Sequence, residues 1–361
     1  MNRLLSSAVA MLCIAGTTTS PRLVNPDRIR SDQWHLQYLQ VSTVHQHSRG
    51  DGITVAVVDT GVDAHPDLRD NIASGLDLTT NSERLEDLDP HGTGIAGLIA
   101  AHGRGPNSGA LGIAPRSKIL PIRDRDLVSK GTSDGLARGI EWAIEHGADV
   151  INISSGGGPS HRLRQAIDAA VRADVVVVAA AGNQPSDLGV SFPAAYDGVL
   201  AVGATDRNGD HAAVSVTGEK VGLSAPGVDI YSTSIDGKYS KATGTSAATA
   251  IVSGAVALVR SRFPGLSARE VVHRLTATAV DKGAPGRDEQ YGYGVLDLVA
   301  ALTADVPPLE SGAPSPSGTA GASPPDGSGG SDRAAIWAAA VVLAVGVTAL
   351  LVGLRRRQRG H

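Results

Sequence analysis

The chain has 361 residues, 42% of them hydrophobic. This is enough for one large domain with a buried core and for further residues at both ends. The net charge is −4, and no basic excess marks the globular part, which argues against a nucleic-acid partner. Cys13 is the only cysteine and lies in an apolar N-terminal segment, so the globular part contains neither a disulfide nor a thiol nucleophile.

The N-terminus has the features of an export signal. Arg3 is followed by an apolar run over residues 4–15 and by small and polar residues at 16–20, which are the three parts of a secretory signal peptide. A short buried helix is the alternative. A lipoprotein signal at Cys13 is rejected because Leu12 stands where a small residue is expected. We therefore predict a signal peptide over residues 1–20 and an N-terminal extension over residues 21–33.

Strands and helices alternate between residues 34 and 302. Apolar runs with little alternation predict strands buried on both faces, at residues 53–58, 118–122, 150–153, 175–179 and 199–202. Helical patterns lie at residues 91–101, 133–146, 160–173, 245–263 and 267–277, the last with Ser267 as its N-cap. This order predicts an α/β domain: a doubly wound parallel sheet with helices on both faces and its functional residues at the carboxyl ends of the strands.

Three segments place a reactive side chain at the end of a predicted element. Asp59 follows the first strand, His91 opens a helix of small residues, and Ser246 opens the longest helix. Taken singly, Asp59 is as well explained as a turn residue, and His91 and Ser246 are better explained as a structural histidine and an N-cap. Together they supply a nucleophile, its base and the acid that orients the base. We predict that Asp59, His91 and Ser246 form a catalytic triad.

The chain order Asp, His, Ser is the order found in subtilisins. The segments around these residues resemble the three signature motifs of the subtilisin family: Asp59-Thr60-Gly61, His91-Gly92-Thr93-Gly94 and Gly244-Thr245-Ser246. The resemblance covers about residues 34–302. It implies a subtilisin-like peptidase domain and a serine endopeptidase that works through an acyl-enzyme without a cofactor.

Further segments resemble other parts of the subtilisin site. Asn183 follows Ala-Ala-Gly at the end of a strand, and the resemblance implies that its amide binds the oxyanion together with the backbone N–H of Ser246; a simple turn role is the alternative. The segment Ser154, Ser155, Gly156 and Gly157 is similar to the strand that pairs with the substrate backbone. Residues 192–194 (Phe-Pro-Ala) resemble a segment near the primary specificity pocket.

Within this family the chain resembles the mycosins, membrane-anchored proteases associated with actinobacterial type VII secretion. The similar segments are residues 32–36, residues 291–294 and the C-terminal tether and span. Two features differ: the mature chain lacks cysteines for the disulfides of mycobacterial mycosins, and Ala250 replaces the family's proline. Too few residues precede Trp34 for a folded prodomain, and we expect residues 25–30 to lie over the domain.

The C-terminus predicts a membrane anchor. Residues 303–333 form a linker rich in Pro, Gly and Ser. Residues 334–354 are apolar and long enough for a transmembrane helix, at ~1.5 Å per residue across ~30 Å of hydrocarbon. The arginine cluster that begins at Arg355 predicts that residues 355–361 stay in the cytoplasm. A buried helix is the alternative for the apolar segment, and the linker argues against it.

These features predict an extracytoplasmic, membrane-anchored serine endopeptidase. Its expected partners are a protein or peptide substrate, the cytoplasmic membrane and type VII secretion components. A general degradative protease and a structural stabiliser of a membrane secretion complex are the alternatives. No metal site is predicted, because no tight ligand spacing links the acidic residues Asp63, Asp67, Asp70, Asp87 and Asp89.

Overall fold

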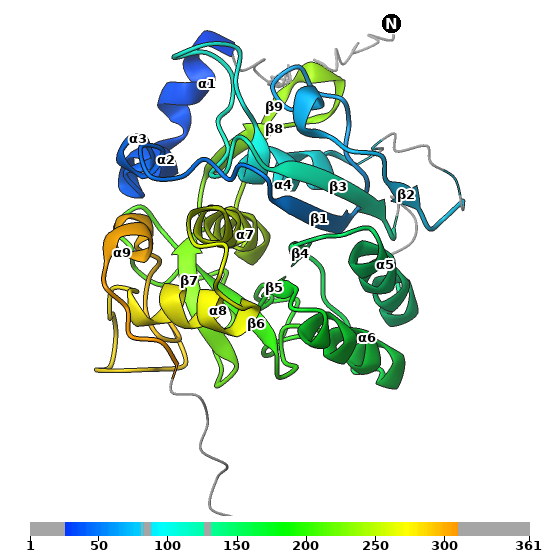
Figure 1. Ribbon diagram of the computed structural model, residues 1–361, viewed down its shortest axis with the longest axis vertical. Helices are drawn as coiled ribbons and strands as arrows, with labels where there is room; N and C mark the ends of the chain where they lie inside the picture. Colours follow the sequence, from blue (N-terminus) through cyan, green and yellow to red (C-terminus); the bar gives the residue numbers. More distant parts are fainter. Residues whose placement is uncertain (1–25, 81, 83–86, 88, 126–130, 310–361) are drawn as a thin grey trace, which may run out of the picture. The chain divides into compact units, whose positions relative to one another are not determined.

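Seven parallel strands form the central sheet of the computed structural model, which describes residues 26–80, 82, 87, 89–125 and 131–309. The strand order is β2 (Leu76–Asp77), β3 (Lys118–Arg123), β1 (Thr54–Asp59), β4 (Val150–Ile153), β5 (Val176–Ala180), β6 (Val199–Thr205) and β7 (Val221–Pro226). The chain leaves β1 towards β3 on one side and continues with β4 on the other (Figure 1). The carboxyl ends of β1 and β4 therefore flank the point where the winding reverses, the usual position of a site in such a sheet.

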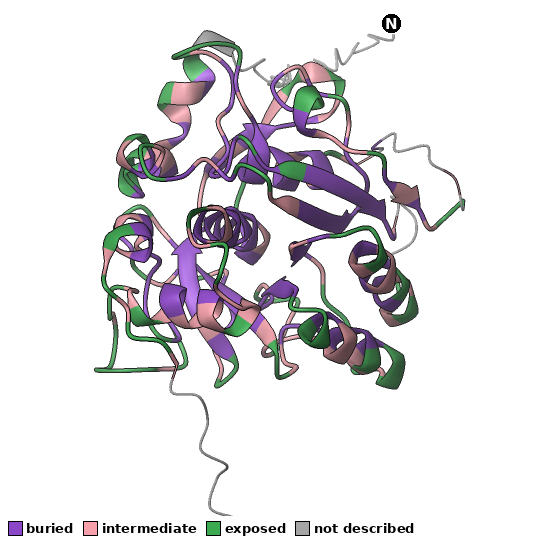
Figure 2. Ribbon diagram, in the orientation of Figure 1, coloured by how far each residue is buried: buried purple, intermediate pink, exposed green. Residues whose placement is uncertain are grey.

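Both faces of this sheet are covered by helices (Figure 2). In β1, Val55 and Val57 belong to one hydrophobic core, whereas Ala56 and Val58 belong to the other, as alternation along a strand requires. The first core is completed by α4 (Pro90–Ala100), α7 (Thr245–Arg262), α8 (Ala268–Ala277) and α9 (Leu298–Thr303), and the second by α5 (Ser133–Glu145) and α6 (His161–Arg172). The predicted doubly wound α/β architecture is confirmed.

Helix α7 is buried on all sides over most of its length. Thr245 and every residue from Ala247 to Val259 are buried, whereas Ser246 is partly exposed. A helix that is apolar all round belongs in the interior of a domain. Its first turn is therefore held in place by the core, and Ser246 is the residue of that turn that reaches solvent.

Several elements were not predicted from the sequence. They include the edge strands β2 and β7, an antiparallel hairpin of β8 (Ile230–Thr233) and β9 (Tyr239–Ala242), the short 3₁₀ helices η1 (Arg69–Asn71) and η2 (Ile235–Gly237), and helix α9 and the three helices that precede β1. The hairpin binds α4: Ser232 Oγ donates to Gly94 O at 2.7 Å and Thr233 Oγ1 donates to Thr93 O at 2.7 Å. It thereby fixes the helix that carries His91.

The N-terminal helices pack on the same compact unit, which ends at Leu309. They are α1 (Pro26–Asp32), α2 (Trp34–Tyr38) and α3 (Val41–Val44). In α1, Ile29 is fully buried and the Arg30 guanidinium donates to the carbonyl groups of Ser108 and Gly109. This segment therefore lies over the domain, as we expected.

No helix among the described residues is long and apolar enough to cross a membrane. The predicted signal peptide (1–20), linker beyond residue 309, transmembrane helix (334–354) and basic tail (355–361) lie outside the described residues.

Candidate active site

The site is built around a buried carboxylate at the winding reversal. Asp59 ends β1 and is fully buried. Its Oδ1 accepts a hydrogen bond from the backbone N–H of Thr60 at 2.8 Å, and its two oxygens lie 2.8 and 3.0 Å from His91 Nδ1. Burial by itself would raise the pKa of Asp59, but the nearby positive charges and these hydrogen bonds lower it to about 2. Asp59 is therefore ionised at neutral pH.

His91 is positioned by the start of helix α4. The helix N-cap is Asp89, whose Oδ1 accepts from the backbone N–H of His91 at 3.0 Å, and Thr60 Oγ1 accepts from Gly92 N at 3.0 Å. Gly92 is required here because a Cβ atom would overlap the carbonyl oxygen of Gly61. The motif glycine thus lets α4 approach the end of β1 closely enough for His91 to reach Asp59.

The tautomer of His91 follows from its partner. Ionised Asp59 can only accept, so Nδ1 carries the proton and Nε2 is left with a free lone pair. The Asp59 carboxylate raises the pKa of His91 above its ordinary value, against the opposing effects of burial and of the Arg125 cation. The Nε2 atom of neutral His91 is thus an acceptor held in one orientation, as a general base would need to be.

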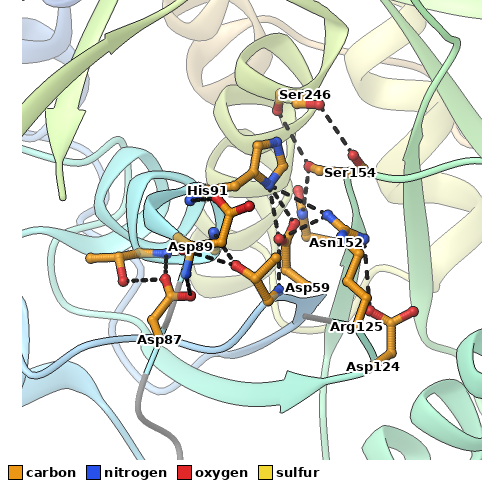
Figure 3. Close-up of polar contacts among 12 residues, drawn as sticks. Asp59, Asp87, Asp89, His91, Asp124, Arg125, Asn152, Ser154 and Ser246 are labelled. Atoms are coloured by element: carbon orange, nitrogen blue, oxygen red, sulfur yellow. Dashed lines mark hydrogen bonds and ion pairs between the residues drawn. The ribbon is translucent and has the colours of Figure 1, made fainter. Parts of the chain in front are cut away.

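Ser246 lies on the other side of His91 from Asp59 (Figure 3). Its Oγ donates to the carbonyl oxygen of Ser154 at 3.1 Å, and this, rather than a bond to His91, is its hydrogen bond in the structure. A rotation about χ1 would redirect the hydroxyl. Long or misdirected contacts between nucleophile and base are common before substrate binds.

Asn183 stands beside this serine. Its Oδ1 accepts from the backbone N–H of Thr245 at 2.9 Å and from Thr245 Oγ1 at 3.3 Å. Only the oxygen of an amide can accept, so these bonds determine which way the side chain is turned. The Nδ2 group of Asn183 takes no part in these two hydrogen bonds. His91, Asn183 and Ser246 line one cleft of about 450 Å³, with Ile95, Leu98 and Ala247 among its apolar residues.

The predicted substrate-binding segment follows β4. Ser154 is buried, Ser155 is partly exposed, and Gly156 and Gly157 are exposed. Gly157 already pairs with Phe192: Gly157 N donates to Phe192 O at 2.8 Å, and Phe192 N donates back at 3.2 Å. The structure therefore brings Ser154 against Ser246, whereas Gly157 is exposed but has its backbone paired with Phe192.

The predicted absence of a metal site concerned five acidic residues. Asp87 accepts from the backbone N–H and the hydroxyl of Thr93 at 2.9 and 2.6 Å, and Asp89 caps α4, so both fix the helix of His91. Asp67 is fully buried and accepts from Arg104 Nε at 2.6 Å. The part of the chain that the structure describes holds no group of three potential ligands in metal-binding proximity.

Comparison with known proteins identifies the family of this site. The model of the subtilase family, Peptidase_S8, matches residues 50–294. The chain belongs to the subtilase family. It is similar to subtilisin DY of Bacillus licheniformis, with 39% identity over 261 residues that cover 71% of this chain and 93% of that protein. It is 38% identical over 265 residues to a thermostable alkaline protease of Halalkalibacterium halodurans, covering 73% of this chain and 71% of the relative.

Solved structures identify the branch. The crystal structure of MycP1 with its N-terminal propeptide removed matches with a TM-score of 0.70 and 34% identity, over 77% of this chain and 98% of that one. MycP1 from Mycobacterium smegmatis matches with a TM-score of 0.69 and 31% identity, over 80% and 87% of the two chains. The subtilase is thus a serine endopeptidase of the mycosin branch.

Sequence reasoning missed one residue of the subtilase site. Arg125 Nη2 donates to Asp59 Oδ1 at 2.8 Å and lies 3.4 Å from His91 Nδ1. The preceding residue, Asp124, is buried and carries a raised pKa of about 7, chiefly because burial disfavours its charged form. The only sequence signal was an Arg just beyond a predicted strand, and it becomes informative only when β3 is known to lie beside β1.

Proposed function

We propose that this subtilase hydrolyses peptide bonds with Asp59, His91 and Ser246 as its catalytic triad. The observation that carries the proposal is the contact of 2.8 Å between Asp59 Oδ1 and His91 Nδ1, with Ser246 on the far side of the imidazole. Ser246 Oγ would attack the substrate carbonyl carbon while His91 Nε2 takes its proton. Asp59 holds the tautomer and stabilises the imidazolium that forms.

The tetrahedral intermediate needs donors for its negative oxygen. Asn183 Nδ2 and the backbone N–H of Ser246, at the start of α7, are the donors in this proposal. When the intermediate breaks down, the imidazolium returns its proton to the leaving amine and the acyl group remains on Ser246. A water molecule, deprotonated by His91, then attacks the acyl-enzyme and frees the serine.

The substrate backbone would add as a strand beside residues 154–157, with Ser155 and Gly156 offering exposed backbone. The expected substrate is thus an extended segment of a protein or peptide. The cleft of about 450 Å³ extends from Ser246 along α4 and β9 and includes His91 and Asn183 in its lining.

We further propose that the catalytic domain works outside the cytoplasmic membrane, anchored by residues 334–354, and serves a type VII secretion system. The support is the basic-apolar N-terminus, the apolar C-terminal segment followed by arginines, and the similarity to a MycP1 described as part of the ESX-1 type VII secretion system. The match to that structure has a TM-score of 0.69 and 32% identity.

A serine-directed phosphonylating reagent tests the chemistry. Mass spectrometry of the treated protein should find one adduct, on Ser246, and Ser246→Ala should abolish both the adduct and peptidase activity. A folded, unblocked domain that stays unmodified at Ser246 would contradict the triad.

The same variant separates catalysis from a structural role in secretion. Loss of secretion by cells carrying Ser246→Ala, with the secretion complex intact, supports the protease. Retained secretion supports a stabiliser of the complex.

A further inference from the structure

We propose that Arg125 is a positioning residue for peptide hydrolysis: its guanidinium binds the buried Asp59 carboxylate beside His91 and sets how readily the imidazole accepts a proton. The proposal rests on the proposed roles of Asp59, His91 and Ser246, and it assigns a function to a side chain outside the substrate cleft.

Sheet register brings Arg125 to this position. Strand β3 pairs in parallel with β1, and Arg123 is the register partner of Asp59. Two residues later the chain has just left the carboxyl end of β3, at the edge of the sheet where Asp59 emerges. The Asp124 backbone N–H donates to Asp59 O at 3.0 Å, which ties the two strand ends together. Arg125 is thus held at this edge by backbone pairing.

The contact with Asp59 is direct and shielded from water. Arg125 Nη2 lies 2.8 Å from Asp59 Oδ1, and the two side chains are 12% and 0% exposed. A hydrogen bond between two ions is stronger than a neutral one, and a low local dielectric strengthens it further. Oδ1 therefore accepts from three donors: Thr60 N, His91 Nδ1 and Arg125 Nη2. This limits rotation of the carboxylate away from the imidazole.

The second consequence is electrostatic. Arg125 Nη2 is 3.4 Å from His91 Nδ1. Since His91 Nδ1 donates its proton to Asp59, it cannot accept from Arg125, and the short distance places the guanidinium charge next to the N–H group of the imidazole. Asp59 favours the imidazolium, and Arg125 opposes it by partly neutralising Asp59 and by repelling a second positive charge. Arg125 accordingly holds the pKa of His91 below the value that Asp59 alone would produce.

The other charges around His91 do not replace this effect. Asp89, at the N-cap of α4, is the remaining acid that acts on it. Lys241 of β9 lines the same cleft but lies 2.7 Å from Asp229 Oδ1. Asp124 Oδ1 is 3.7 Å from Arg125 Nη1, and neither Asp124 oxygen has a hydrogen-bond partner among the described residues. The guanidinium thus lies between two buried acidic side chains, Asp59, which holds His91, and Asp124, whose pKa is raised to about 7.

The test compares Arg125→Met, which removes the charge but retains an unbranched side chain, with Arg125→Lys, which keeps the charge. In Arg125→Met the acid limb of the pH profile of kcat/KM should move to higher pH. Activity should fall severalfold at pH 6 and stay within about twofold at pH 9, where His91 is neutral in either protein. KM should not change, since Arg125 is absent from the residues that line the cleft. Arg125→Lys should restore the limb towards the native position.

A matched control removes an arginine from an exposed ion pair. Arg162 and Glu141 lie 3.2 Å apart on the surface, so Arg162→Met should leave the profile unchanged. An acid limb of Arg125→Met that coincides with the native one would overturn the proposal. So would a limb of Arg125→Lys displaced as far as that of Arg125→Met, because the charge would then not be the cause.

A second readout does not depend on turnover. In the Ser246→Ala background, the imidazole of His91 should titrate at higher pH with Arg125→Met than with Arg125, followed by NMR. Equal titration in a folded pair would refute the role of Arg125. If Ser246→Ala still hydrolyses peptides, the triad assignment fails instead, and the NMR comparison still decides whether Arg125 acts on His91.

Discussion

Removal of the Asn183 side chain gives the sharpest test of the oxyanion site. The Asn183 carboxamide has two ends with different roles. Its Oδ1 accepts from Thr245 N at 2.9 Å, and its Nδ2 is the proposed donor to the oxyanion. Asn183→Ala removes both functions, whereas Asn183→Asp keeps the acceptor for Thr245 and replaces the donor with a negative charge.

The two variants should differ in stability and agree in catalysis. Loss of one oxyanion donor lowers kcat by about 10²–10³, a range known from a subtilisin side chain of this role, which is about 2.7–4 kcal/mol of transition-state stabilisation. KM should change little, because the negative oxygen exists mainly in the transition state. In Asn183→Ala the Thr245 N–H loses its acceptor at the first turn of α7, which costs about 1 kcal/mol of folding free energy where water can enter the cleft.

Steady-state kinetics on a chromogenic peptide and thermal unfolding of both variants supply the measurements. Asn183→Asp should unfold near the native temperature, yet lose at least as much kcat as Asn183→Ala, since a carboxylate repels the oxyanion. An Asn183→Asp enzyme within tenfold of native kcat would refute the assignment. A loss confined to KM in Asn183→Ala would instead indicate a substrate-binding role.

Three further predictions concern pH, packing and anchoring. Since the pKa of His91 is raised, kcat/KM should fall as the pH drops through a pKa above 6.5. Since the pKa of Asp59 is lowered from 3.8 to about 2, its contribution to stability should be complete above pH 3.8 and disappear as the pH falls through 2. Asp59→Asn, which cannot titrate at this position, is the control, and the native protein should lose more stability than it does over this range. In chemical denaturation, Gly97→Ala should be less stable than Gly94→Ala by about 1–3 kcal/mol. A Cβ at Gly97 would overlap Thr233 Oγ1, whereas a Cβ at Gly94 meets nothing closer than 3.5 Å. Equal stabilities of the two variants would contradict this account of the contact between α4 and the hairpin. Truncation after Leu309 should release an active domain from the membrane fraction. In intact protoplasts, external protease should reach the domain of the full-length protein. If the truncated protein stays in the membrane fraction, another element anchors it.

The sequence alone determined the central architecture. The five predicted strands are present as β1, β3, β4, β5 and β6, and the five predicted helices as α4 to α8. Their signal is local: a strand buried on both faces must be apolar throughout, and a helix that covers it must be apolar on one side. The capping box of α8, in which Ser267 and Glu270 bond each other's backbone, is equally local and was predictable.

Elements without such a local signal were missed. Strand β7 contains Gly222, Ser224 and Pro226, which do not favour a strand, and it exists because β6 offers it a pairing edge. The β8–β9 hairpin is held against helix α4, a partner distant in the chain, by hydroxyl groups of β8. Pairing of this kind depends on what lies alongside the segment.

The site shows the same division. Asp59, His91, Asn183 and Ser246 stand in recognisable motifs at element ends, and these motifs were the basis for predicting them as site residues. Only the tertiary structure decided that Ser246 Oγ is bonded to Ser154 O, that Asn183 Oδ1 is held by Thr245, and that Arg125 lies against Asp59. The last contact has no motif, because it depends on β3 being the neighbour of β1 and on the register that sets Arg123 opposite Asp59. Spatial adjacency across a sheet is a property of strand order, and strand order is set by how the helices close the two cores.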